Sequence, residues 1–280
     1  MLERRVLDYL TCKERGTVRE VPESFNFSPA DRPAAGRLIV PGVTPDDHPG
    51  LTFSEAGDRT DVAWQPPRAS TASREIPMKS GSSIRGHLVD IARNRLLSFE
   101  SILEYLMINI VMADKNIVLI EDQPAELPFE LDGCQHRHTI DIRTTTVSGL
   151  RVAYAVKPEG CLGRDQTVRK MQALETLHAP TFASKFIVCT EAKITKDYGW
   201  NAVDINEARA VRCAAHCERV LEVLLGIGHR IEIWRLQETI GDEVDVWSAV
   251  LCLFYDRVVQ IEEPRRRFSD ASVILPIILQ

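Results

Sequence analysis

The stretch VAYAVKPEG, Val152–Gly160, indicates the fold most directly. A short run of valine, tyrosine and alanine follows the turn residues Ser148 and Gly149, and such a β-rich run after a turn is typical of a strand. The run therefore predicts a strand that carries Lys157 to the end of a sheet.

Elements on both sides of this strand complete an α/β pattern. The expected elements, in chain order, are a helix over 98–113, a strand over 116–122, a hairpin of 127–131 and 135–143, the strand ending at Lys157, a helix over 165–177 and a strand over 185–190. The first helix has apolar residues at helical spacing, with either Ser98 or Ser101 as its cap, and the dipeptide Asp132-Gly133 is typical of a hairpin turn. The α-β-β-β-α-β order predicts a small mixed sheet flanked by helices.

Composition divides the chain into three parts. Residues 1–82 are dense in Pro, Gly, Ser and Asp and predict an extended, largely irregular arm with a short helix over 2–14. Residues 83–202 hold the α/β pattern. Residues 203–280 alternate helical and β-rich runs and predict a second domain resembling a winged helix.

The overall charge and the cysteines restrict the class of protein. The formal net charge of −6 argues against a uniformly basic DNA-coating protein, so nucleic-acid contacts must come from local clusters or partners. Seven cysteines without a signal peptide favour a reducing cytoplasm, and no apolar run approaches the length of a membrane span. We expect a soluble cytoplasmic protein.

Three ionisable residues fall at positions that the expected sheet can bring together. Glu104 lies inside the first helix, Asp141 within or at the end of the middle strand, and Lys157 at the end of the next strand. Carboxylates can hold one or two Mg²⁺ ions for phosphodiester hydrolysis, and a lysine can stabilise the charge that develops on phosphate. A lone acid and a lysine are also common on a solvated face, so spacing by itself leaves both interpretations open.

A resemblance to a known family favours the catalytic interpretation. Several short motifs occur in order over residues 95–204: SILE at Ser101–Glu104, DQP at Asp122–Pro124, TID at Thr139–Asp141, VK at Val156–Lys157 and VCTE at Val188–Glu191. This series resembles the TnsA endonuclease family, nucleases of the PD-(D/E)xK fold that work inside heteromeric transposases. The resemblance implies a restriction-endonuclease-like fold.

The resemblance also implies an activity and partners. It implies a Mg²⁺-dependent DNA endonuclease, with Mn²⁺ as a substitute, that cuts the 5′ (non-transferred) strand at transposon ends in the bacterial cytoplasm. Its implied partners are double-stranded DNA, a TnsB-type DDE recombinase and a TnsC-type AAA+ ATPase. The implied catalytic residues are Glu104, Asp141 and Lys157, with metal held by Glu104, Asp141 and the backbone carbonyl near Val156.

The departures from the family pattern concern the metal ligands. Ala155 stands where restriction-type enzymes have an acid, although the family tolerates a neutral residue there. Gln123, Ala155 and Glu159 are possible supporting residues, with Glu159 as a possible compensating carboxylate. Asp122 replaces the usual Glu, and we expect this change to have no effect on the chemistry. Glu100 is expected to be a negative charge favoured at the start of the helix rather than a metal ligand.

The C-terminal part offers two further candidate features. Arg265, Arg266 and Arg267 lie in a turn between β-rich runs and could contact DNA or a partner, whereas the acidic residues that open the preceding helix would repel phosphates. We therefore expect this helix to face a protein, and the resemblance implies that the domain docks on the ATPase. A long helix is expected over 207–226, and Cys213, His216 and Cys217 would lie on one of its faces, where they could bind Zn²⁺. No fourth ligand is evident, and buried cysteines explain the pattern better.

Two alternative functions remain open at this level. One is a non-catalytic adaptor that keeps the nuclease fold and joins DNA to partner proteins. The other is a stand-alone repair or defence nuclease. A neighbouring recombinase gene and ATPase gene would favour transposition over the latter.

Overall fold

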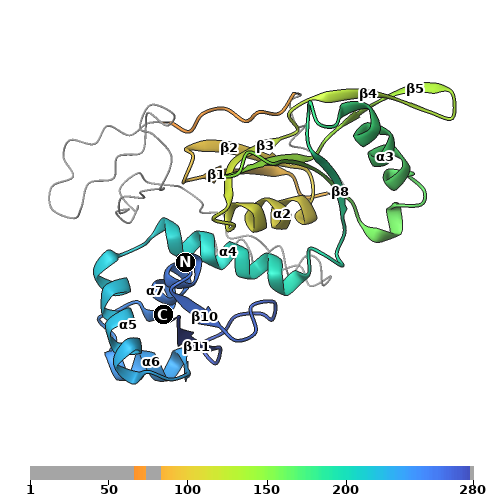
Figure 1. The fold of residues 1–280 in the computed structure, drawn as a ribbon. Helices are drawn as coiled ribbons and strands as arrows, with labels where there is room; N and C mark the ends of the chain where they lie inside the picture. The colour runs from red at the N-terminus through yellow and green to blue at the C-terminus, as the bar shows by residue number, and fades with distance from the viewer. Residues whose placement is uncertain (1–65, 74–82, 278–280) are drawn as a thin grey trace, which may run out of the picture. The chain divides into compact units, whose positions relative to one another are not determined.

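The computed structural model describes residues 66–73 and 83–277. The arm expected over 1–82, including the short helix over 2–14, lies outside these residues except for 66–73. Labels follow Figure 1.

A four-stranded mixed sheet forms the centre of the α/β part (Figure 1). Its strands are β3 (Ile117–Asp122), β6 (Ile142–Thr146), β7 (Arg151–Val156) and β8 (Lys185–Cys189), in the spatial order β3-β6-β7-β8. The first two pairs are antiparallel and the β7–β8 pair is parallel. Helix α3 (Thr167–His178) supplies the crossover that a parallel pair needs. The expected mixed α/β sheet is confirmed.

The expected hairpin is a separate ribbon outside this sheet. Strands β4 (Glu126–Leu131) and β5 (Cys134–Thr139) pair with each other and extend beyond the sheet at the upper right of Figure 1. Asp132 and Gly133 have φ values of 52° and 74°, a left-handed conformation that suits this dipeptide in a two-residue turn. The run expected as one strand over 135–143 is interrupted at Ile140 and Asp141, so β5 and β6 belong to different sheets.

Two helices pack on the sheet. Helix α2 (Ile102–Met112) contacts β3 and β7. Helix α3 contacts β4 and β8, and its Met171 and Leu174 belong to the same apolar cluster as Ala153 and Ala155 of β7. Helix α2 begins later than expected because residues up to Phe99 belong to a strand. The side chain of Ser101 accepts a hydrogen bond from the backbone N–H of Glu104, so Ser101 rather than Ser98 is the cap.

A hairpin that the sequence analysis missed precedes α2. Strands β1 (Gly86–Asp90) and β2 (Arg95–Phe99) pair antiparallel. Residues 66–73 run beside β2, since the N–H of Arg68 donates to the carbonyl of Asn94 and the N–H of Leu96 donates to the carbonyl of Arg68. Part of the expected irregular arm is therefore tied to the α/β part.

The C-terminal part follows an alternation of helices and short strands. In chain order it contains α4 (Lys196–Ala210), α5 (Ala214–Ile227), β9 (Ile231–Glu232), α6 (Ile233–Ile240), α7 (Val246–Tyr255), β10 (Val259–Ile261) and β11 (Val273–Pro276). The strands form a sheet in the order β10-β11-β9. The prediction of one long helix over 207–226 is wrong, because residues 211–213 are not helical and separate α4 from α5. The boundary expected at residue 203 falls within α4.

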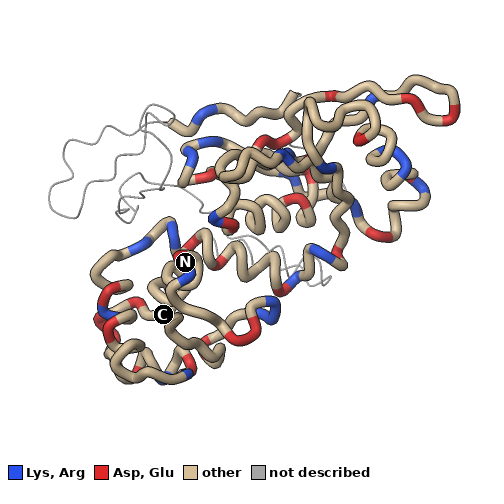
Figure 2. The backbone as a smooth tube through the Cα atoms, in the orientation of Figure 1, with Lys and Arg blue, Asp and Glu red and all other residues tan. Residues whose placement is uncertain are grey.

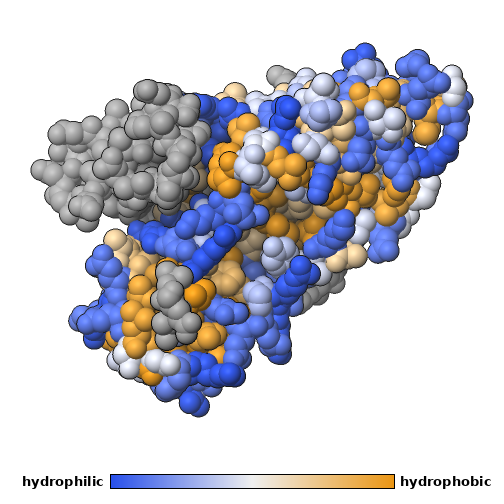
Figure 3. All heavy atoms as spheres, viewed as in Figure 1, coloured by the Kyte–Doolittle hydropathy of each residue, from blue (hydrophilic) through white to orange (hydrophobic). Residues whose placement is uncertain are grey.

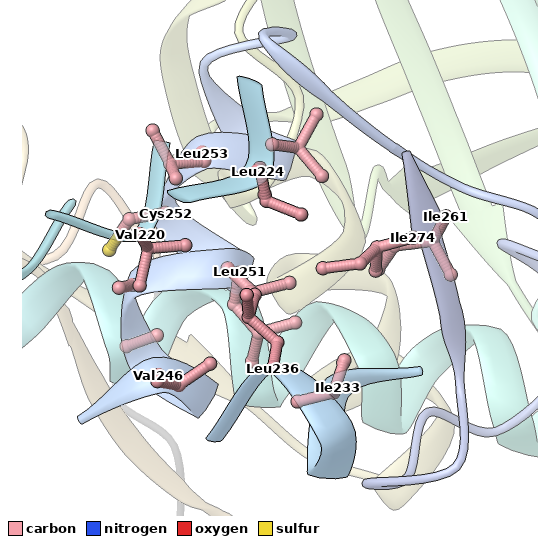
Figure 4. Packing of buried hydrophobic residues seen from close by; sticks show 14 of the residues in the cluster. Val220, Leu224, Ile233, Leu236, Val246, Leu251, Cys252, Leu253, Ile261 and Ile274 are labelled. Carbon is pink, nitrogen blue, oxygen red and sulfur yellow. The ribbon is translucent and has the colours of Figure 1, made fainter. Parts of the chain in front are cut away.

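Helix α4 contacts both the α/β part and the remaining C-terminal elements. It packs against α2 on one side and α7 on the other. A Cβ atom at Gly199 would lie 2.9 Å from the Cβ of Leu106, so glycine is needed where α4 approaches α2. Apolar side chains from α5, α6, α7 and the three strands form the second core, shown in part in Figure 4. Within 66–73 and 83–277, the helices are too short or too polar to span a bilayer.

Candidate active site

Helix α2 holds Glu104 at its first turn. The carboxylate accepts hydrogen bonds from the backbone N–H of Glu100 at 2.9 Å and from the hydroxyl of Ser101 at 3.1 Å. Together with the bond from Glu104 N–H to Ser101, this is a reciprocal capping arrangement. The side chain is thus fixed at the helix start and only 7 % exposed.

Sheet register brings Asp141 to the same edge. Asp122 of β3 pairs with Ile142 of β6, and Ile142 pairs with Tyr154 of β7. Asp141 therefore lies where β3 and β7 end, and it immediately precedes β6. The sequence analysis had instead expected it within or at the end of a strand. Its Oδ2 atom accepts a hydrogen bond from the N–H of Val156 at 2.7 Å, which fixes the carboxylate against the end of β7.

Lys157 follows β7 directly and faces this carboxylate. Its Nζ atom is 3.8 Å from Oδ2 of Asp141, with the two side chains 31 % and 11 % exposed. Its backbone N–H donates to the carbonyl of Cys189 at the end of β8. The lysine is anchored by the sheet, and its ammonium group remains open to solvent.

The pKa of Glu104 shows that the three groups share one electrostatic environment. Burial, and after it the charge of Asp141, raise this pKa from the ordinary 4.5 to about 7, although the hydrogen bond from Glu100 and the charge of Lys157 act in the opposite direction. Two carboxylates therefore repel each other in a poorly solvated place beside one lysine. Such an arrangement favours an added positive charge.

Gln123 occupies the end of β3 at the same edge. Its N–H donates to the carbonyl of Asp141, and its φ of 40° turns the chain away from the sheet. The amide nitrogen donates to Glu100 at 3.1 Å, whereas the buried Oε1 has no hydrogen-bond partner among the described residues. Gln123 thus supports the backbone position of Asp141. The side-chain Oε1 atom of Gln123 remains able to accept a hydrogen bond from another group.

Asp122 has a structural role at this edge. Its carboxylate accepts hydrogen bonds from the hydroxyl groups of Ser70 and Thr71 and from the backbone N–H groups of Thr71 and Ser98. These bonds attach the segment 66–73 to the end of β3. Asp122 is fully buried, and these bonds satisfy its carboxylate within the chain. That it lies outside the chemistry stays a prediction.

Two expected supporting residues do not join the carboxylates. Ala155 is fully buried in the apolar cluster beneath α3 and offers no ligand. Glu159 is exposed in the short 3₁₀ helix η2 (Glu159–Cys161), where its N–H donates to Glu191 at 2.9 Å. Among the contacts of the described residues, none connects the carboxylate of Glu159 with Glu104 or Asp141.

The sequence analysis missed His138, near the base of the β4–β5 hairpin. Its pKa is lowered to about 4 by burial and by the charges of Lys157 and Lys170. The histidine therefore lies close to the candidate site. The only sequence signal was its position three residues before Asp141, and histidines at such positions are common in strands without a functional role.

The residues of the cysteine-rich stretch lie in different surroundings. Cys213 is the residue before α5 and is exposed, Cys217 is buried in the core against Cys252, and His216 accepts a hydrogen bond from the N–H of Asp245 at 3.3 Å. Within 66–73 and 83–277 there is no group of three or more His, Cys, Asp or Glu residues placed to hold a metal. The preference for core packing is confirmed for Cys217.

The three arginines of the loop between β10 and β11 have different surroundings. Arg267 pairs with Asp204 and donates to Asn201 at 3.0 Å, so it attaches the loop to α4. Arg266 pairs with Glu263 on the exposed loop, and Arg265 lies 5.7 Å from the ring of Tyr198. Arg265 and Arg266 are available to a partner, whereas Arg267 is already used within the chain.

Helix α7, the helix expected to face a protein, is covered along its length. Each of its residues is buried or half-buried, because α4, α5 and α6 pack against it. Arg209 of α4 stacks on Tyr255 at 3.8 Å, and Phe254 contacts Phe268 edge to face. Most of the surface of α7 is therefore used in packing within the chain.

No protein-family model and no curated protein matches this chain.

Proposed function

We propose that this chain is a Mg²⁺-dependent DNA endonuclease of the TnsA type, cutting the 5′ strand at transposon ends. The convergence of Glu104, Asp141 and Lys157 at one edge of the central sheet carries this proposal. The mixed β3-β6-β7-β8 sheet with α2 and α3 is compatible with a nuclease-like fold.

The oxygen atoms at this edge fit a hard divalent cation. Glu104 and Asp141 supply two carboxylates, the ligand type that suits Mg²⁺, and a cation would relieve their mutual repulsion. The expected backbone carbonyl of Val156 would be a third oxygen, and Mg²⁺ commonly keeps several waters. Bound Mg²⁺ would supply an activated water and neutralise charge on the scissile phosphate.

The chain's own residues would divide the remaining work. Asp141 is held against β7 by Val156, so its carboxylate has a fixed direction. Glu104 is fixed by its cap, and Lys157 places an ammonium group beside Asp141, where phosphate charge would develop. Each group is therefore preorganised by backbone hydrogen bonds.

The C-terminal part supports a role in binding proteins more than DNA. The order helix, strand, two helices and two strands, with the sheet order β10-β11-β9, is the pattern that favours a winged-helix-like domain. The rest of the C-terminal part carries acidic positions along its backbone (Figure 2). Its exposed large apolar side chains include Val211, Leu225 and Trp234. Figure 3 shows hydrophobic and hydrophilic residues side by side on the face of this part that is turned to the viewer. This composition suits a protein partner such as the TnsC-type ATPase better than phosphates.

Calorimetry with Mn²⁺ tests the metal assignment. The wild-type chain should bind Mn²⁺, and Asp141→Asn, which keeps the shape of the side chain, should lose this binding. Asp132→Asn, at the exposed hairpin turn, is the matched control and should bind as wild type. Equal binding by Asp141→Asn would remove Asp141 from the site.

A non-catalytic adaptor is the second candidate. The buried Ala155 and the use of both Glu104 oxygens by the helix cap favour it, because they leave few oxygen ligands. Loss of 5′ cleavage in Asp141→Asn, measured with the recombinase, the ATPase and transposon-end DNA, would support the endonuclease. Undiminished cleavage would support the adaptor.

A further inference from the structure

Gln123 is hydrogen-bonded to both of the segments that hold the candidate carboxylates. Its backbone N–H donates to the carbonyl of Asp141 at 3.0 Å, just after the end of β3. Its side-chain Nε2 donates to Oε1 of Glu100 at 3.1 Å, in the link between β2 and α2. One buried residue, 3 % exposed, is therefore bonded both to Asp141 and to the chain that enters α2.

Glu100 continues this contact to Glu104. Its backbone N–H donates to Oε2 of Glu104 at 2.9 Å. The side chain of Glu100 is also held by Arg85, whose Nη2 atom lies 3.9 Å from the Oε2 atom of Glu100. A series of hydrogen bonds thus joins Asp141 to the carboxylate of Glu104, with Gln123 at its centre.

The conformation of Gln123 is costly for a glutamine. Its φ of 40° lies in the left-handed region that favours glycine, and its buried Oε1 has no hydrogen-bond partner among the described residues. A turn at this place requires only a residue that tolerates a positive φ. Backbone strain persists where the surrounding structure imposes it, and it is concentrated at functional sites. A glutamine kept here at this cost is a candidate for a role beyond the turn.

We propose that Gln123 is a positioning residue that fixes the separation of the Glu104 and Asp141 carboxylates. The proposal rests on the proposed function for the cation that these carboxylates would share. Mg²⁺ demands near-ideal octahedral geometry, so a change in the separation of its ligands reduces its affinity. Residues that orient metal ligands typically contribute about 10- to 100-fold to that affinity. Gln123 acts on Glu104 through Glu100, and on Asp141 through the main chain.

Gln123→Gly removes the amide and keeps the turn, because glycine adopts a positive φ without strain. In calorimetry on the full chain, it should raise the dissociation constant of Mn²⁺ at least about tenfold. Gln166→Gly is the matched control, because Gln166 is a second glutamine with positive φ, 49°, and is exposed before α3. It should bind Mn²⁺ as wild type does. Equal affinity in Gln123→Gly and wild type would overturn the proposal.

Variants of Glu100 test the link to Glu104, and they also apply if Gln123→Gly fails to fold. Glu100→Gln keeps a side-chain oxygen for the Gln123 amide and should retain Mn²⁺ binding, because Arg85 already faces the charge that is removed. Glu100→Ala removes the acceptor and should weaken binding as much as Gln123→Gly. Combining the two should add little further loss, since both remove the same bond. Additive losses would show two independent effects and overturn the link.

Gln123→Glu distinguishes positioning from ligation. The substitution keeps the length of the side chain, replaces the donor Nε2 by a carboxylate oxygen and adds a negative charge. If Gln123 acts by positioning, this variant should lose Mn²⁺ affinity, because the bond to Glu100 becomes a repulsion between like charges. Tighter binding than wild type would show that residue 123 is itself a ligand, and would overturn the positioning role.

Hydrogen exchange in the metal-free chain separates this proposal from the metal assignment. The backbone N–H of Glu100 is bonded to Glu104, so Gln123→Gly should accelerate its exchange, whereas Gln166→Gly should not. If wild type binds no Mn²⁺ but Gln123→Gly exchanges faster at Glu100, the metal assignment fails and the positioning role stands. Unchanged exchange at Glu100 in Gln123→Gly would overturn the positioning role whatever the metal result.

Discussion

The sheet edge around Asp141 and the core of the C-terminal part treat polar groups in opposite ways. At the sheet edge, two carboxylates face one lysine, and the buried atoms Gln123 Oε1 and His138 Nε2 lack partners among the described residues. In the C-terminal part, Asn201 of α4 is 1 % exposed and uses both ends of its amide, with bonds to Pro264, Arg266, Arg267 and Phe268. Buried polar atoms at the sheet edge thus remain without partners among the described residues, whereas Asn201 uses its polar atoms to hold the β10–β11 loop against α4.

Truncating the C-terminal core is expected to have the largest effect of the changes considered below. Leu251 is fully buried in the cluster around α7 (Figure 4), and Leu251→Ala should lower the free energy of unfolding by about 4 kcal/mol. Urea unfolding measures this change. Mn²⁺ binding by the protein that remains folded should match wild type. Loss of that binding would show that the sheet edge around Asp141 depends on the C-terminal core.

The charge at Glu104 should make the metal-free chain less stable as pH rises. A folded pKa of about 7 against an ordinary 4.5 means that protonation favours the folded state, so this contribution is complete below about 4.5 and is lost as pH rises through about 7. The free energy of unfolding should fall by about 3 kcal/mol over this range. The charged groups that act on the carboxyl group of Glu104 are Asp141 and Lys157.

Glu104→Gln should remove this dependence on pH. Urea unfolding at pH 5 and pH 8, with a chelator present, should show a smaller loss of stability in Glu104→Gln than in wild type. Glu130→Gln, at an exposed position of β4, is the control and should keep the wild-type loss. Identical losses in Glu104→Gln and wild type would show that Glu104 is not strained by its surroundings.

Lys157→Ala tests whether the sheet edge has a catalytic role. Loss of a preorganised positive group beside the phosphate should lower 5′ cleavage by the assembled system about 100-fold, or about 2.7 kcal/mol of barrier. Mn²⁺ binding should change little because an ammonium group is not a ligand. Lys185→Ala is the matched control. Unimpaired cleavage by Lys157→Ala would remove the lysine from the chemistry.

The arginines of the β10–β11 loop should give the smallest effect. Arg265→Ala combined with Arg266→Ala should weaken salt-sensitive binding to DNA or a partner a few-fold, and removing each arginine that binds a phosphate should reduce the salt slope by about 1. Arg267→Ala should instead lower stability, because Arg267 is bound to Asp204 and Asn201. The opposite assignment, with Arg267 alone affecting binding, would contradict these separate roles.

Local sequence signals predicted the elements whose determinants are close in the chain. The turn at Asp132-Gly133, the β-rich run ending at Val156 and the apolar spacing of α2 and α3 each act over a few residues. The approach of Asp141 to Lys157 was predictable for the same reason, since a tight turn joins β6 and β7.

Features that depend on distant residues could not be predicted. The bonds from Ser70 and Thr71 to Asp122 join positions about fifty residues apart, and nothing in the local pattern marks them. The covering of α7 by α4 and the capture of Arg267 by Asp204 likewise follow from packing. The role of Glu104 as both helix cap and candidate ligand was hidden because the motif Ser101–Glu104 serves either purpose.

The hydrogen bond from Gln123 N–H to the carbonyl of Asp141 closes the β4–β5 hairpin at its base. The segment from Pro124 to Ile140 therefore leaves the central sheet and returns to it at the same place. Doubling the length of such a closed loop costs only about 0.6 kcal/mol in chain entropy. Evolution, or a protein engineer, can therefore lengthen, shorten or exchange the tip around Asp132 while the base residues keep their places, which makes the tip a natural position for acquiring new specificity.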